Sequence, residues 1–276
     1  MTNIMKASHN PPRGRPFLAL PFCLALAVLA CCSGLAAPKD PEGRAGDKPA
    51  AANSDNLVPL MLNLPAAAFK GTPKDLKVGP NVEPLSDKPR PPMMVPAGLK
   101  NLAPEAKLTC SDKNAAADIL GKITDGNKDA SDDSIIFLRK GRQWVQMDLG
   151  NTYEIFAIVL WHAHNTAKVY HDVIVQTADD PDFIQNVRTI FNNDQDNTSG
   201  LGVGTDREYF ETNEGKLIDA KGIKARYLRF YSKGSTESAM NEYTEIEVYG
   251  RSPAVAAQAQ APAFAAAGAP AAPRAE

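Results

Sequence analysis

The sequence WVQMDLG at residues 144–150 is followed by IFAIVLWHAH at residues 155–164, and these two stretches decide the fold class. The first alternates apolar and polar residues and stops at a glycine, which predicts a strand with one buried face. The second is almost continuously apolar, which predicts a strand covered on both faces. Shorter runs at residues 169–177, 226–232 and 245–250 are separated by loops rich in Gly, Asp, Asn and Pro. We therefore expect an all-β sandwich or barrel, with a helical turn only at residues 114–121.

Composition separates one acidic, strand-rich region from two arms. Residues 101–252 contain 17 Lys and Arg against 24 Asp and Glu, whereas the flanking residues are basic and hold most of the 22 prolines. The acidic balance, without an aromatic-interleaved basic stripe, argues against a nucleic-acid partner. We expect one globular domain over residues 101–252, a mostly extended Pro/Lys/Ala-rich linker over residues 38–100, and a disordered Ala/Pro-rich tail over residues 253–276.

The first 37 residues have the pattern of an export signal. Three basic residues precede an apolar run at residues 17–30, which is too short to span a bilayer and is followed by small residues. Two cleavage positions remain open. VLAC at residues 28–31 resembles a bacterial lipobox, in which Cys31 becomes the lipidated N-terminus, whereas cleavage near Ala36 or Ala37 would match an ordinary signal peptidase. We expect an exported protein, in the cell envelope or secreted, with a membrane contact only through a lipid on Cys31.

The order and spacing of the segments resemble a discoidin domain, also called a coagulation factor 5/8 type C domain, of the galactose-binding jelly-roll superfamily. The matching segments are NLA at 101–103, ITDGN at 123–127, WVQMDLG at 144–150, the strand ending at Trp161, the strand from Tyr170 to Asp179-Asp180, ARYLR at 225–229 and EIEVYG at 245–250. The resemblance implies a jelly-roll β-sandwich. It also implies extracellular carbohydrate or a cell-surface glycoconjugate as the partner.

The chain departs from the family pattern at three points. Many members have Ser-Asp-Gly followed by Trp, where this chain has ADDP at residues 178–181 and then Phe183. An Asn/Asp/Gly-rich segment is inserted at residues 192–206, and the terminal disulfide of the animal members is missing because Cys110 is the only cysteine of residues 101–252. These departures bear on ligand specificity and not on the fold.

A calcium site is predicted in the loop that follows residue 124. Asp125, Asn127 and Asp129 alternate there around a glycine and offer oxygen atoms to a hard cation. The resemblance implies a structural calcium at this place, held also by backbone carbonyls and by a glutamate of the last strand, which Glu245 matches. The same residue types also suit a solvated turn, so that alternative stays open.

A second site is predicted from three histidines within ten residues. Strand alternation places His162 and His164 on one face, and a turn near residues 166–167 would bring His171 opposite them. Neutral imidazoles grouped in this way can ligate zinc, copper or nickel. Alternatively they contact a sugar at the rim of the sandwich, where we expect Tyr170 and Arg139 to join them.

No enzyme is expected, because the sequence contains no GxSxG, no HExxH and no Cys/His pairing, and its carboxylates scatter over loops. The preferred function is a non-catalytic, exported binding module that recognises carbohydrate or adheres to a cell surface through one rim of a jelly roll. The alternative is a metal-binding or structural envelope protein that uses the jelly roll as a scaffold.

Overall fold

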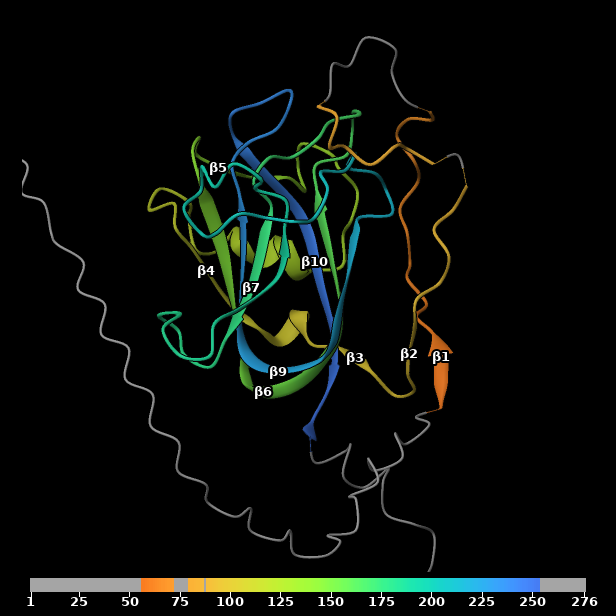
Figure 1. Cartoon of the computed structure of the whole chain (residues 1–276), viewed down its shortest axis with the longest axis vertical. Helices are drawn as coiled ribbons and strands as arrows, with labels where there is room; N and C mark the ends of the chain where they lie inside the picture. The colour runs from red at the N-terminus through yellow and green to blue at the C-terminus, as the bar shows by residue number, and fades with distance from the viewer. Residues whose placement is uncertain (1–55, 72–78, 87, 254–276) are drawn as a thin grey trace, which may run out of the picture. The chain divides into compact units, whose positions relative to one another are not determined.

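Ten strands and two short 3₁₀ helices form the described part of this computed structural model, which comprises residues 56–71, 79–86 and 88–253 (Figure 1). The expected signal peptide and all but the first residue of the expected tail lie outside these residues. The elements are β1 (Leu57–Pro59), β2 (Met94–Pro96), β3 (Lys100–Asn101), η1 (Ala103–Glu105), β4 (Lys107–Cys110), η2 (Leu120–Thr124), β5 (Ile136–Leu138), β6 (Gln143–His162), β7 (Ile174–Ala178), β8 (Arg188–Asn192), β9 (Lys216–Ser232) and β10 (Asn241–Arg251). Within the described ranges, we find no helix with the length and apolarity needed to cross a membrane.

The two longest strands, β6 and β9, run through both layers of a sandwich. The first part of β6 pairs with β4 and with the end of β9, where Val145 lies opposite Phe230. After a register shift beside Gly150, the rest of β6 pairs with β10 and with the beginning of β9, where Ile158 lies opposite Ile218. β7 and β8 extend the first layer, and β3 and β5 pair with β10 in the second. Figure 1 shows β6 and β9 curving together at one end of the sandwich. The expected jelly-roll β-sandwich is confirmed.

Inward side chains of both layers fill one core. Along β6, Val145 and Met147 from the first layer and Ile158 and Leu160 from the second are fully buried. The alternation at residues 144–150 is therefore the alternation of a strand with one face in the core. The two stretches that the sequence separates at residues 150–155 form one strand, because β9 pairs with both of them.

The apolar run at residues 155–164 is covered on its outer face by the segment that precedes β9. The indole nitrogen of Trp161 donates a hydrogen bond to the carbonyl of Asn213 at 3.0 Å. Gly215 has a φ of +62°, and a Cβ there would lie 2.6 Å from the Trp161 ring. A glycine is required at this position both by the backbone conformation and by the close approach of the indole.

Two expected elements are displaced. The strand expected at residues 169–177 begins only at Ile174, because Val169 and Tyr170 form isolated bridges with Phe210 and Ser235 and do not enter a ladder. The helical turn expected at residues 114–121 lies instead at η2, which begins at Leu120.

The segment expected to be a linker packs against the domain. The backbone N–H of Arg90 donates to the Glu214 carboxylate at 3.1 Å, and its guanidinium donates to the carbonyls of Glu214 and Gly215 at 2.9 and 2.7 Å. Val82 packs against Phe210 in a small apolar cluster. The described part of residues 38–100 therefore contacts the domain through Arg90 and Val82.

Candidate functional site

One end of the sandwich carries an exposed aromatic ring beside an exposed guanidinium. β5 alternates, so Ile136 and Leu138 are buried while Phe137 is 47% exposed. Arg139 follows on the same face as Phe137, and its side chain is 54% exposed. An exposed phenyl ring at the end of a strand contributes little to the stability of the free protein. This pair is therefore the starting point of the candidate site.

Asp112 fixes the position of Arg139. The Asp112 carboxylate accepts one hydrogen bond from the Arg139 backbone N–H and one from its Nε, both at 2.8 Å. Burial alone would raise the pKa of Asp112, but the N–H groups of Asn114 and Arg139 and the guanidinium outweigh it, so the pKa lies below its usual value. The carboxylate thus stays ionised and holds the guanidinium ready for a partner.

The side chain of Asn241 ties together the loops at this end. Its Nδ2 donates to the carbonyls of Arg139 and Gly141 at 2.7 and 2.9 Å, and its Oδ1 accepts hydrogen bonds from Ser232 and Gly234 at 2.8 and 2.9 Å. Asn241 is fully buried. One amide therefore fixes the base of the loop after β5 and of the loop between β9 and β10.

Two further polar side chains belong to the same edge. Phe137 lies opposite Glu242 in the β5–β10 register, and Glu242 accepts a hydrogen bond from Lys168 at 3.0 Å. The same lysine reaches the half-exposed Glu237 at 3.5 Å, and Glu237 accepts a hydrogen bond from the exposed Thr166 at 2.6 Å. We call the exposed group Phe137, Arg139, Thr166 and Glu237 the loop edge.

The expected rim role of His162 and His164 is wrong, because both are buried. The Nδ1 of His162 lies 3.0 Å from Glu211, and its ring stacks on Tyr170 with centroids 4.2 Å apart. The Nε2 of His164 donates to the carbonyl of Lys128 at 2.8 Å. Tyr170 is buried as well, and its hydroxyl donates to Glu242 at 2.8 Å. These residues form a polar network under the edge and do not face solvent.

His171 and Arg139 remain accessible among the five residues expected to bind a ligand. The side chain of His171 is 40% exposed, and its Nδ1 lies 2.9 Å from Glu208. Its backbone N–H donates to Gly234, the same glycine that Asn241 holds. His171 is therefore linked to the base of the loop edge through one hydrogen bond.

The histidines do not gather around one point. Within the described ranges, the group of His, Cys, Asp and Glu close enough to share an ion is Asp172, Asp194 and Asp196, with ligand atoms within 4.8 Å. Lys233 already lies 3.2 Å from Asp172, and the Thr198 and Ser199 hydroxyls donate to the same carboxylate. The predicted soft-metal site on His162, His164 and His171 is therefore not formed.

Substitutions of His162 and His171 are expected to have different effects on stability. His162→Ala should lower the free energy of unfolding by roughly 3 kcal/mol, because it leaves a void and an unpaired, buried Glu211. His171→Ala removes a half-exposed pair and should cost less than about 1 kcal/mol. Urea denaturation of the two variants measures the difference. Equal, small losses would mean that His162 is accessible after all.

The expected calcium residues are only partly brought together. Gly126 donates its N–H to both carboxylate oxygens of Glu245 at 3.2 Å, so the loop and the last strand meet. The side chains of Asp125 and Asn127 cap the backbone N–H two residues ahead, at 2.8 and 3.1 Å. Asp129 is exposed. Asp125 and Asp129 do not join Glu245 in a three-carboxylate group like the one at Asp172.

Glu245 is nevertheless in an unusual environment for a carboxylate. It is fully buried, and burial raises its pKa to about 8 despite the Gly126 hydrogen bonds and the charge of Lys128. Lys128 is itself buried and lies 2.8 Å from Glu247, the next residue on the same face of β10. Two buried carboxyl groups thus lie near one ammonium group, which pairs directly with Glu247.

Residues that the sequence did not single out are central to the loop edge. Phe137 sits in the run SIIFLR at residues 134–139, which gives no sign of which apolar residue faces solvent. Glu237 lies in a polar loop without a motif, and Asn241 begins β10 just after it. We identify this end of the sandwich as the candidate site from the exposed positions of Phe137 and Arg139 in the structure, and not from a sequence motif.

No family model and no curated protein matches this chain. Solved structures that are similar include a family 89 glycoside hydrolase from Clostridium perfringens, with a TM-score of 0.39, 17% identity, and coverage of 56% of this chain and 15% of that chain. A chitosan-binding module from Paenibacillus sp. IK-5 has a TM-score of 0.38, 19% identity, and coverage of 54% and 98%. A fucolectin from striped bass, Morone saxatilis, has a TM-score of 0.38, 18% identity, and coverage of 56% and 48%. Likenesses this distant assign neither a ligand nor an activity to this chain.

Proposed function

We propose that this protein is a non-catalytic module that binds carbohydrate at the loop edge. The observation that carries the proposal is the exposed ring of Phe137 beside the fixed guanidinium of Arg139. The C–H face of a pyranose packs on an aromatic ring, while its hydroxyls accept from a guanidinium and donate to a carboxylate. Glu237 supplies that carboxylate, and Thr166 supplies a hydroxyl that works in either direction.

Binding is favoured over catalysis because the acids around the edge are already engaged. Glu242 pairs with Lys168 and Tyr170, and Asp112 holds Arg139. General acid–base chemistry needs a carboxyl group free to exchange a proton with a substrate. We accordingly assign Glu242 and Asp112 a role in positioning neighbouring side chains and not in catalysis.

The experiment that tests the proposal compares Phe137→Ala with Val203→Ala on a glycan array. We expect Phe137→Ala to weaken binding of the glycans recognised by the parent protein by roughly tenfold or more, because stacking on an aromatic ring contributes about 1–2 kcal/mol. Val203 is also exposed, at 67%, but is not one of the four residues of the loop edge, so its variant should bind normally. Both variants should melt close to the parent, since surface positions contribute little to stability.

Two outcomes would contradict this assignment. Full binding by Phe137→Ala would move the ligand away from the loop edge. Binding of no glycan by the well-folded parent would leave the jelly roll as a scaffold of the envelope, the alternative function.

We further propose that calcium is the structural cofactor of the loop at residues 125–129. Support comes from the buried carboxylate of Glu245, which faces this loop and whose burial strongly disfavours its ionised form in the absence of a further cation. Asp125, Asn127 and Glu245 would hold the ion together with backbone carbonyls, since calcium prefers such oxygen donors. Its role would be to neutralise Glu245 and stabilise the loop.

We also propose that the protein is exported and anchored by a lipid on Cys31. This rests on the leader and on VLAC at residues 28–31 in the sequence. The anchor would place the binding module in the cell envelope, at the end of the segment that joins Cys31 to the domain.

A further inference from the structure

The ribbon formed by β1 and β2 has one face on the domain and one face in solvent. Pro59 lies opposite Met94 and Val58 lies opposite Val95 in their antiparallel register. Because side chains alternate along a strand, Val58 and Val95 share one face and Leu57, Pro59 and Met94 share the other. Val95 is 2% exposed, whereas Leu57 and Met94 are 53% and 51% exposed. On this second face Leu57, Pro59 and Met94 are exposed, whereas Pro96, which lies opposite Leu57, is buried.

This face is the main concentration of exposed apolar side chains on the described part of the chain. Met61, two residues beyond Pro59, is 80% exposed, and Leu64 is 41% exposed. Half of the eight large hydrophobic side chains found exposed in the described ranges thus lie on one short arm. Apolar groups gathered in this way mark an interaction surface more often than single exposed residues do. We call Leu57, Met61, Leu64 and Met94 the arm face.

Charge around the arm face is positive. The described residues from 56 to 101 carry four basic side chains, and Lys70, Lys88 and Lys100 among them are exposed. Glu83 is the acid found in the same described residues, and it pairs with Lys216 of the domain at 3.3 Å. Apolar side chains bordered by lysines complement an anionic lipid surface, in which each nearby lysine contributes about 1 kcal/mol.

The position of the arm face in the sequence also favours a lipid surface as its partner. Only 25 residues separate Leu57 from Cys31, the proposed lipid anchor. Whatever its conformation, a chain of that length reaches at most roughly 90 Å, so the anchor keeps the arm face close to the bilayer and raises its effective concentration there. Four exposed apolar side chains bind a membrane only weakly by themselves. When the chain is anchored to the same bilayer, such weak binding is sufficient to dock the domain.

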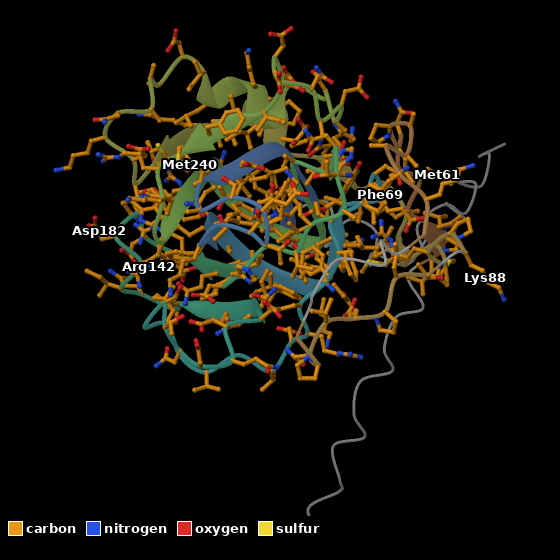
Figure 2. All side chains as sticks on the ribbon, turned by 90° about the horizontal axis from the view of Figure 1, so that it is seen from above. Met61, Phe69, Lys88, Arg142, Asp182 and Met240 are labelled. Carbon is orange, nitrogen blue, oxygen red and sulfur yellow. The ribbon has the colours of Figure 1, made fainter. Side chains whose placement is uncertain are left out.

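We propose that the arm face, formed by Leu57, Met61, Leu64 and Met94, docks the domain on the bilayer that holds its lipid anchor. This inference rests on the anchoring proposed above. Figure 2 shows Met61, Phe69 and Lys88 on one side of the domain and Arg142 and Met240 on the other. Met240 precedes Asn241, at the base of the loop edge. A domain docked through the arm face thus turns its loop edge away from the membrane.

Methionine oxidation tests the proposal directly. The chain without residues 1–30, which retains the whole compact unit beginning at Ala51, is prepared with Cys32→Ser and Cys110→Ser so that only Cys31 can react. It is coupled through Cys31 to a maleimide lipid in vesicles of phosphatidylethanolamine and phosphatidylglycerol. Peroxide oxidation of each methionine is then followed by mass spectrometry, for the coupled chain and for the same chain free in solution.

We expect coupling to slow the oxidation of Met61 and Met94 by roughly threefold or more, because a docked face excludes the oxidant. Met240, on the other side of the domain, should oxidise at the same rate in both states. Leu57→Ser should restore the rate at Met61 towards that of the free chain, and Ile184→Ser, which changes an exposed apolar residue outside the arm face, should not.

Equal rates for Met61 in the coupled and free chains would overturn the proposal. Protection of Met61 in the free chain that grows with protein concentration would also overturn it, since it would identify a second copy of the chain as the partner. The synthetic linkage keeps the test independent of the natural lipid. Glycan binding by the same preparation reports separately on the loop edge, so a failure of one assignment is not mistaken for a failure of the other.

Discussion

Replacing Lys128 with methionine is expected to lower the free energy of unfolding by about 3–5 kcal/mol. The ammonium group lies 2.8 Å from Glu247, and both side chains are only 7% exposed. Methionine preserves the apolar part of the side chain, so the decrease in the free energy of unfolding measures the effect of removing the charge. Without the lysine, the Glu247 carboxylate stays in the interior without the cation that neutralises it. Denaturant titration of the variant measures the effect.

Lys113→Met is the matched control for this experiment. Lys113 is exposed and has no counterpart of the Glu247 contact among the ion pairs of the described residues, so its substitution should cost less than about 0.5 kcal/mol. A loss below about 1 kcal/mol in Lys128→Met would show that water reaches Glu247. The loop at residues 125–129 would then be held by its backbone contacts alone.

Without calcium, the stability of the domain is expected to fall as the pH rises from about 4.5 to about 8. In the folded state Glu245 keeps its proton up to a pKa of about 8, whereas the unfolded chain releases it near 4.5. Between these values the unfolded state binds fewer protons than the folded state, so the free energy of unfolding decreases with rising pH, by a few kcal/mol in all. The contribution of Glu245 to stability is fully present below pH 4.5.

Added calcium is expected to reverse this loss at pH 8. Binding only to the folded state contributes about 2.7 kcal/mol at a hundredfold excess over Kd. Melting temperatures in EDTA and in millimolar calcium, at pH 5 and pH 8, measure both effects. Glu245→Gln should abolish the pH dependence and the response to calcium, and Glu105→Gln, at an exposed position, should preserve them. Melting curves that are the same in EDTA and calcium at both pH values would refute the calcium assignment.

The core-facing side chains of the strands can be predicted from the sequence because they follow the local alternation of apolar and polar residues. Val145 and Met147 face the core as the pattern at residues 144–150 predicts. The joining of two predicted strands into β6 could not be predicted, since it depends on pairing with β9, whose residues lie more than fifty positions further along the chain than their partners. Local patterns give the faces of strands, and long-range pairing decides their ends.

The histidine prediction was wrong for a related reason. Alternation places His162 and His164 on the same side of β6, but it does not reveal what covers that side. Glu211, the partner of His162, lies 49 residues further along the chain, in the segment that packs over the end of the strand. A residue expected at a rim becomes an interior residue when a distant loop closes over it.

The segment around Arg90 shows the same limit of prediction from a single sequence. The prolines at residues 89–92 predict an extended backbone, but they carry no information on whether that segment contacts the domain. The contacts that dock it join Arg90 to Glu214, 124 residues away. Single-sequence reasoning cannot pair two charged residues at that separation.

The buried amide of Asn241 has a consequence for engineering. It fixes the bases of two loops at once, through the carbonyls of Arg139 and Gly141 on one side and the N–H of Gly234 on the other. Ser235 and Thr236, which bond to Tyr170 and Val169, belong to the same frame. Glu237 and Ala239 are exposed beyond it, so these two positions can be randomised in a library without disturbing the frame, as in antibody loops on their sandwich. New sugar specificities should then be selectable by varying these two positions together with Phe137, provided that Asn241 is retained in every clone.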